Sequence, residues 1–96
     1  MTAPGSEEEG AYLESLTGVN TWINCNDLTS QGTWECKDLD TYIGYRNWAE
    51  GNPDNYDGNE RCVEIWRQSA LWNDAGCYWD HPSVCKQSLT KIVHWR

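Results

Sequence analysis

The chain has 96 residues, of which 15 are acidic and 7 are basic, giving a formal net charge of −8. This balance disfavours nucleic acid and anionic membrane surfaces as partners, because both are bound largely through Lys and Arg that neutralise phosphate. No apolar run approaches the roughly 20 residues of a membrane span, so we expect no membrane insertion. A chain of this length is expected to form a single domain over residues 1–96, with a small core that needs a covalent or metal staple.

The first predicted element is a helix. Residues 1–5 are interpreted as a flexible lead-in, and Ser6 with Glu9 forms a capping-box pattern at a helix start. Gly18 is a stop signal, which predicts a helix over about residues 7–17. Its apolar stripe consists of Tyr12, Leu13 and Leu16.

Five short segments rich in Trp, Ile, Val and Thr follow the helix, separated by Asn, Asp and Gly. This composition is typical of short strands in a small mixed or antiparallel sheet, and with the helix it predicts an α+β fold. The chain end from Gln87 is expected to be a final strand followed by an untethered tail, placed at residues 88–96. The five segments are TWINC, GTWEC, CVEIW, LWND and SVCKQ.

A long stretch without clear periodicity separates the second and third of these strands. Long loops in compact domains are usually functional or disordered, and the Trp, Tyr and Pro residues within this one argue against disorder. Part of it, GNPDNYDGNERC, places the amide of Asn52 and the carboxylate of Asp54 on either side of a proline. A cis X-Pro bond would turn both side chains to the same side of the loop.

Further oxygen-bearing side chains accompany this loop. Glu60 follows within it, and Asn73 and Asp74 stand at a predicted strand end. Three carboxylates and two amides offer only oxygen ligands, which is the preference of Ca²⁺ over softer metals. An EF-hand is not indicated, because aligning Gly58 and Glu64 to its pattern leaves a proline at the first ligand position.

Several of these motifs, in this order and spacing, resemble the C-type lectin-like domain. The resemblance covers about residues 12–86 and implies that family's fold, with its first strand and first helix missing, so that the chain forms a partial domain. The matching motifs are YLESL, TWINCND at the position of the family's WIGL segment, GTWEC, NWAEGNPDN, ERCVEI, LWNDAGC and SVCK.

The resemblance also implies a calcium and sugar site. In such lectins two vicinal sugar hydroxyls complete the calcium shell, donating to carboxylates and accepting from amides. The implied metal ligands are Asn52, Asp54, Glu60, Asn73 and Asp74. The implied sugar-binding residues are Asn52, Asp54, Tyr56, Glu60 and Asn73, with the Tyr56 ring either stacking on the sugar or packing the turn.

Two details refine this expectation. The order amide, proline, carboxylate resembles galactose-type rather than mannose-type sites, although Asn52 is one methylene shorter than the family's usual Gln or Glu. The family's second calcium position is expected to be lost, so we predict one ion. Asp27 is retained there, whereas Gln31, Asn55 and Arg61 replace residues that are usually acidic.

Five cysteines indicate an oxidising compartment and hence a secreted or extracellular protein. The resemblance implies a Cys62–Cys77 bridge. Cys25 and Cys36 lie on two segments that should pair as a hairpin, where they either bridge each other or are buried free thiols. Cys85 matches a cysteine whose partner lies on the missing helix, so it is the expected unpaired thiol.

The expected function is calcium-dependent carbohydrate binding without enzymatic activity. Asp54 and Glu60 could imitate a glycosidase pair, but carboxylates neutralised by calcium are poor proton shuttles. His81 and His94 are isolated from any nucleophile, which favours a surface or packing role. One alternative is a calcium-independent module that binds a protein partner on the same fold, and another is an incomplete fragment.

Overall fold

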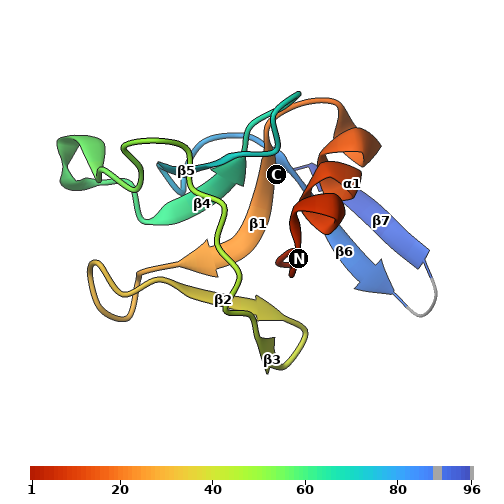
Figure 1. The fold of residues 1–96 in the computed structure, drawn as a ribbon, viewed down its shortest axis with the longest axis horizontal. Coiled ribbons are helices and arrows are strands. Elements are labelled where there is room, and N and C mark those ends of the chain that lie inside the picture. Colours follow the sequence, from red (N-terminus) through yellow and green to blue (C-terminus); the bar gives the residue numbers. More distant parts are fainter. Residues whose placement is uncertain (88–89, 96) are drawn as a thin grey trace.

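The computed structural model describes residues 1–87 and 90–95, and it confirms the α+β prediction. One helix lies beside a mixed sheet, and the long loop projects on the far side of the molecule from the helix (Figure 1). In chain order the elements are α1 (Glu7–Thr17), β1 (Thr21–Asn26), β2 (Glu35–Asp38), β3 (Thr41–Tyr42), a 3₁₀ turn η1 (Tyr56–Gly58), β4 (Cys62–Ile65), β5 (Trp72–Ala75), β6 (Pro82–Gln87) and β7 (Thr90–Trp95). No helix in these described ranges is long and apolar enough to span a membrane.

Helix α1 begins and ends where its sequence signals predict. The hydroxyl of Ser6 accepts a hydrogen bond from the backbone N–H three residues later at 3.1 Å. Gly18 closes the other end with a left-handed φ of 71°, a conformation that glycine adopts without the steric cost of a side chain. Of the predicted stripe only Leu13 is buried, whereas Tyr12 and Leu16 are exposed.

Strand β1 is the centre of the sheet. One of its edges pairs antiparallel with β4, which in turn pairs with β5. The other edge forks: near its start β1 pairs in parallel with β6, and at its end it pairs antiparallel with β2. The strand predicted over GTWEC is shifted, since β2 begins only at Glu35.

The fork is filled by the N-terminal segment, so the predicted flexible lead-in is wrong for residues 2–4. The Thr2 N–H donates to the Val84 carbonyl of β6 at 3.0 Å, and the Thr2 carbonyl accepts from the Asn24 N–H of β1 at 2.9 Å. Thr2 and Ala3 are almost fully buried. The segment is ordered because it satisfies backbone groups that the fork between β1 and β6 would otherwise leave unpaired.

The predicted tail is wrong for residues 90–95. These residues form β7, which pairs antiparallel with β6 through register partners such as Cys85↔Ile92 and Lys86↔Lys91. The segment TKIVHW is rich in β-branched and aromatic residues, which favour a strand once a neighbouring edge is present to pair with. Residues 88, 89 and 96 of the predicted tail lie outside the described residues.

The core anchors the start of the long loop. Trp72 is fully buried on β5, and the rings of Trp48 and Tyr45 from the loop meet it edge to face, each with centroids 5.8 Å away. The backbone supports the same contact, because the Trp72 N–H donates to the Asn47 carbonyl and the Ala49 N–H donates to the Trp72 carbonyl, each at 2.9 Å. Residues 45–49 are therefore held against β5, and the loop that follows stays next to that strand.

Candidate functional site

Beyond residues 45–49, the next contact of the loop with β5 joins two amides. The Asn52–Pro53 peptide bond is cis. Asn52 Nδ2 donates to Asn73 Oδ1 at 2.8 Å, so the carbonyl oxygen of the Asn52 amide is the atom left over by this bond. Asn73 stands on β5 one residue before Asp74, and the loop thereby meets the strand at the predicted strand end.

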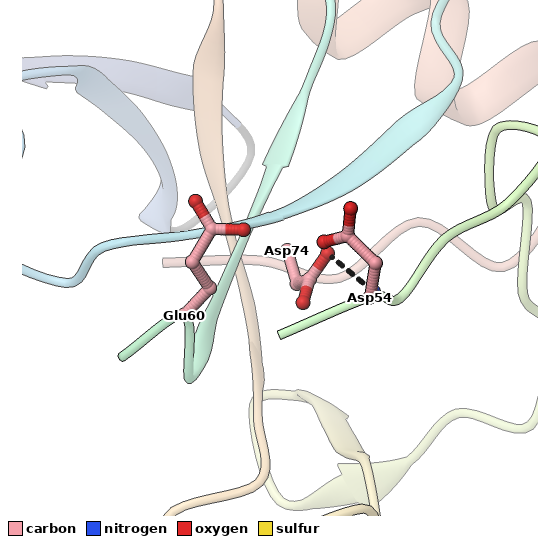
Figure 2. Close-up of side chains that lie close together, drawn as sticks. All are labelled: Asp54, Glu60 and Asp74. Atoms are coloured by element: carbon pink, nitrogen blue, oxygen red, sulfur yellow. Dashed lines mark hydrogen bonds between the residues drawn. The ribbon is translucent and has the colours of Figure 1, made fainter. Parts of the chain in front are cut away.

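The next contact joins the Asp74 carboxylate to the backbone of the loop. Asp74 is fully buried on β5, and its carboxylate accepts from the backbone N–H groups of Asp54 at 3.1 Å and of Asn55 at 2.5 Å. These two bonds hold the Asp54 backbone directly against Asp74 (Figure 2).

Glu60 completes the cluster from the end of the loop. Asn55, in a left-handed conformation with φ 48°, turns the chain and accepts from the Glu60 N–H through its side-chain oxygen at 3.1 Å. The carboxylates of Asp54, Glu60 and Asp74 offer oxygen atoms that all lie within 4.8 Å of one another (Figure 2). Residues separated in sequence are thus gathered into one acidic group.

Burial, and then the charge of the neighbouring carboxylates, disfavours the ionised forms of Asp74 and Glu60. Burial raises the pKa of Asp74, and although the two backbone hydrogen bonds from Asn55 and Asp54 oppose this, the net direction is upward. Burial also raises the pKa of Glu60, followed by the negative charges of Asp74 and Asp54. A divalent cation among these oxygens would compensate both effects, so the donor set fits a hard cation such as Ca²⁺.

Glu64 is a buried carboxylate next to Asn73 that the sequence analysis did not identify as a site residue. Glu64 is buried on β4, where its Oε2 accepts from Asn73 Nδ2 at 2.8 Å and from Trp66 Nε1 at 3.1 Å. Its Oε1 lies 2.7 Å from Nε2 of the half-buried His81. Glu64 therefore sets the orientation of the Asn73 amide, and the available signal was an acidic residue within the apolar strand CVEI.

Two of the four residues assigned to the family's second calcium position, Asp27 and Arg61, contact each other. Arg61 Nε lies 2.7 Å from Asp27 Oδ1, and the same guanidinium donates to the Asp27 carbonyl. Asp27 also accepts from the Gly32 N–H at 2.9 Å. The cationic group of Arg61 thus occupies the surroundings of the retained carboxylate.

The structure contains two disulfides, one of which lies at the site. Cys62–Cys77 closes the end of the β4–β5 hairpin, which carries Asp74 and begins two residues after Glu60. Cys25–Cys36 joins register partners on β1 and β2, which decides between the bridge and the free thiols that the sequence left open. Cys85 is a free, half-buried thiol whose Sγ lies 2.9 Å from the N-terminal amine.

The structure therefore brings all five predicted metal ligands to one edge of the sheet. The sixth predicted site residue, Tyr56, lies on η1 in the same loop and is 63% exposed. Its ring is accessible to a ligand.

Comparison with known proteins gives consistent matches. The family model of the lectin C-type domain matches residues 1–87. C-type lectin lectoxin-Enh5 of Pseudoferania polylepis is 36% identical over 72 residues, which cover 73% of this chain and 45% of that protein. Hepatic lectin of Gallus gallus is 37% identical over 71 residues, which cover 73% of this chain and 34% of that protein. The chain spans less than half the length of these curated relatives.

Solved structures share the fold. The carbohydrate-recognition domain of the mouse scavenger receptor C-type lectin superimposes with a TM-score of 0.63 at 30% identity, over 80% of this chain and 62% of that one. A calcium-independent type II antifreeze protein superimposes with a TM-score of 0.72 at 19% identity, over 100% of this chain and 66% of that one, which is a likeness of fold alone.

Proposed function

Since the chain belongs to the lectin C-type domain family, we propose that it binds carbohydrate through one Ca²⁺ ion. The observation that carries this proposal is the convergence of the Asp54, Glu60 and Asp74 carboxylates, whose oxygens lie within 4.8 Å of one another. Asn52 and Asn73, already in contact with each other, would supply the amide oxygens of the same site.

Bound calcium would supply coordination positions that two vicinal sugar hydroxyls can share. The chain's own groups orient the sugar: carboxylate oxygens accept from its hydroxyls, and amide N–H groups donate to them. Asn73 donates one N–H to Glu64 and Asn52 donates one to Asn73, each at 2.8 Å, so each amide keeps a second N–H that can donate to the sugar.

We further propose a galactose-type preference and a single ion. The order of Asn52, Pro53 and Asp54 supports the former, together with the exposed ring of Tyr56, which can stack on the apolar face of a sugar. The ion pair between Arg61 and Asp27 supports the latter, since a guanidinium beside the second position repels a cation.

We also propose that the protein is secreted or extracellular. The two disulfides, Cys25–Cys36 and Cys62–Cys77, are bonds that persist in oxidising compartments and are reduced in the cytosol.

Thermal unfolding in EDTA and then in millimolar calcium tests the ion site. Calcium at about a hundred times its dissociation constant should stabilise the fold by about 2.7 kcal/mol, which raises Tm by several degrees. Asp54→Asn and Glu60→Gln should each abolish this rise, whereas the matched controls Asp80→Asn and Glu35→Gln, both at exposed positions, should retain it. A folded wild-type protein that melts identically in both buffers would refute the proposal.

One observation favours a second candidate, a calcium-independent module that binds a protein partner. Asp74 has its carboxylate bonded to two backbone N–H groups, and Asn52 and Asn73 bond each other, so the loop is closed by its own hydrogen bonds. Ligand binding that survives EDTA and the Asp54→Asn substitution would select this candidate over the first.

A further inference from the structure

A cavity of about 420 Å³ opens beside the carboxylate cluster. Its volume falls within the roughly 300–1,000 Å³ typical of small-molecule sites. It is larger than a metal centre requires, so the proposed ion leaves it unexplained. The cavity is lined by Tyr56, Asn59, Glu60, Gly76, Tyr78 and Trp79.

Two aromatic rings form a corner of this cavity. Tyr78 and Trp79 lie in the turn after β5, beyond Gly76 and Cys77. They are 72% and 36% exposed and stand perpendicular to each other, with ring centroids 6.5 Å apart. Neighbouring exposed rings of this size are unusual on a surface that serves only solubility. Both rings line the cavity, and the amide of Asn59 and the carboxylate of Glu60 supply polar groups on the same lining.

The corner is held in place before any ligand arrives. A Cβ atom on Gly76 would lie 2.8 Å from Tyr78 Cε1 and 2.9 Å from Trp79 Nε1, so glycine is what allows both rings to fold back over the strand end. The turn is closed by the Trp79 N–H, which donates to the Gly76 carbonyl at 3.0 Å, and by the disulfide at Cys77. A preformed wall of this kind loses little conformational entropy when a ligand binds.

Glu60 connects the cavity to the metal centre, because the same side chain lines the cavity and belongs to the three-carboxylate cluster. A ligand held at the cluster can therefore extend past Glu60 onto the two rings. The combination of aromatic faces with an amide and a carboxylate matches a pyranose ring, which has an apolar C–H face and a rim of hydroxyls.

We propose that this cavity binds the second sugar ring of a glycan whose first ring lies at the calcium centre. The inference rests on the proposed function and extends it, since the preferred ligand becomes an oligosaccharide rather than a monosaccharide. Stacking of one ring on an aromatic face should strengthen binding by about three- to tenfold over the monosaccharide.

Calorimetric titration in calcium tests this with two matched pairs of probes. One pair is methyl β-galactoside and lactose, and the other is methyl α-mannoside and α-linked mannobiose. The quantity compared is the ratio of disaccharide to monosaccharide affinity in the wild type, in Tyr78→Ala and in Trp79→Ala. Tyr42→Ala is the matched control, because Tyr42 is 64% exposed on β3 and does not line the cavity.

In the wild type we expect a ratio of about three to ten for the sugar series that binds, and the same ratio in the control. The ratio should fall to about one in Tyr78→Ala and Trp79→Ala. Gly76→Ala, which keeps both aromatic rings but displaces them, should lower it as well.

A wild-type ratio of about one, or a ratio that persists in both ring variants, would overturn the inference while leaving monosaccharide binding and the proposed function intact. Failure of all four sugars to bind calcium-loaded, folded protein would instead overturn the proposed function and this inference with it. Because Tyr78 is largely exposed, Tyr78→Ala keeps the test available if Trp79→Ala fails to fold.

Discussion

Removing the Cys62–Cys77 bridge should lower both the stability of the fold and its affinity for calcium. Removing Cys25–Cys36 should lower the stability alone. The bridge closes a loop with a sequence separation of 15, and Cys25–Cys36 closes one of 11. Loop-closure entropy grows only with the logarithm of length, so each bridge contributes about 3 kcal/mol. At this chain size each loss should lower Tm by about 12–24 °C.

The two bridges differ in what they hold. Cys62 pairs with Ala75 at the open end of the β4–β5 hairpin, and the next register pair joins Val63 with Asp74. Without the bridge this end can fray and carry Asp74 away from Glu60, which reduces the population that can bind calcium. Cys25–Cys36 joins β1 to β2, and neither of these strands carries a carboxylate of the cluster.

The double variants Cys62→Ala/Cys77→Ala and Cys25→Ala/Cys36→Ala should therefore lose similar stability but differ in calcium affinity. We expect about a tenfold or greater weakening for the first and little change for the second, both measured by calorimetric titration at a temperature where each variant is folded. A Cys85→Ser background removes thiol exchange from both. Equal calcium affinity in the two double variants would refute the role assigned to the Cys62–Cys77 bridge.

Three further outcomes are expected. The pKa values of Glu60 and Asp74 are raised, so in EDTA the folded state keeps their protons to higher pH than the unfolded state does. The contribution of these two carboxyl groups to the free energy of unfolding therefore falls as the pH rises through their pKa values. Protons would compete with the proposed calcium ion for the same oxygens, so the calcium-induced rise in Tm should shrink as the pH falls below neutral; a constant rise would contradict this. Gly18→Ala should cost about 1 kcal/mol or more at the left-handed end of α1, seen as a Tm lower by about 4–8 °C, while Gly5→Ala, which has open space at Cβ, serves as control. Deleting residues 1–4 should abolish cooperative melting monitored by circular dichroism, because it leaves buried backbone groups in the fork between β1 and β6 without partners; an unchanged melt would contradict the structural role of this segment.

Local chemistry in the sequence was sufficient for the elements that depend on neighbours along the chain. The helix from Glu7 to Thr17 follows from the capping hydroxyl of Ser6 and from the terminal Gly18. Both residues form their hydrogen bonds with backbone groups only a few positions away. The candidate ligands were visible because oxygen-bearing side chains cluster around one proline, and because a family pattern joins them to the distant Asn73–Asp74 pair.

What only the tertiary structure decided depends on contacts between distant segments. Thr2 is ordered because β1 and β6 leave unpaired backbone groups on either side of it, and β7 forms because β6 offers an edge. The acidic residue within CVEI marks Glu64 as unusual but does not identify its partner Asn73, and Trp79 carries no local signal that its ring folds back over Gly76. Spacing along the chain predicts which residue types are available, but only packing determines which oxygens and rings meet, because each such contact joins groups that the sequence keeps apart.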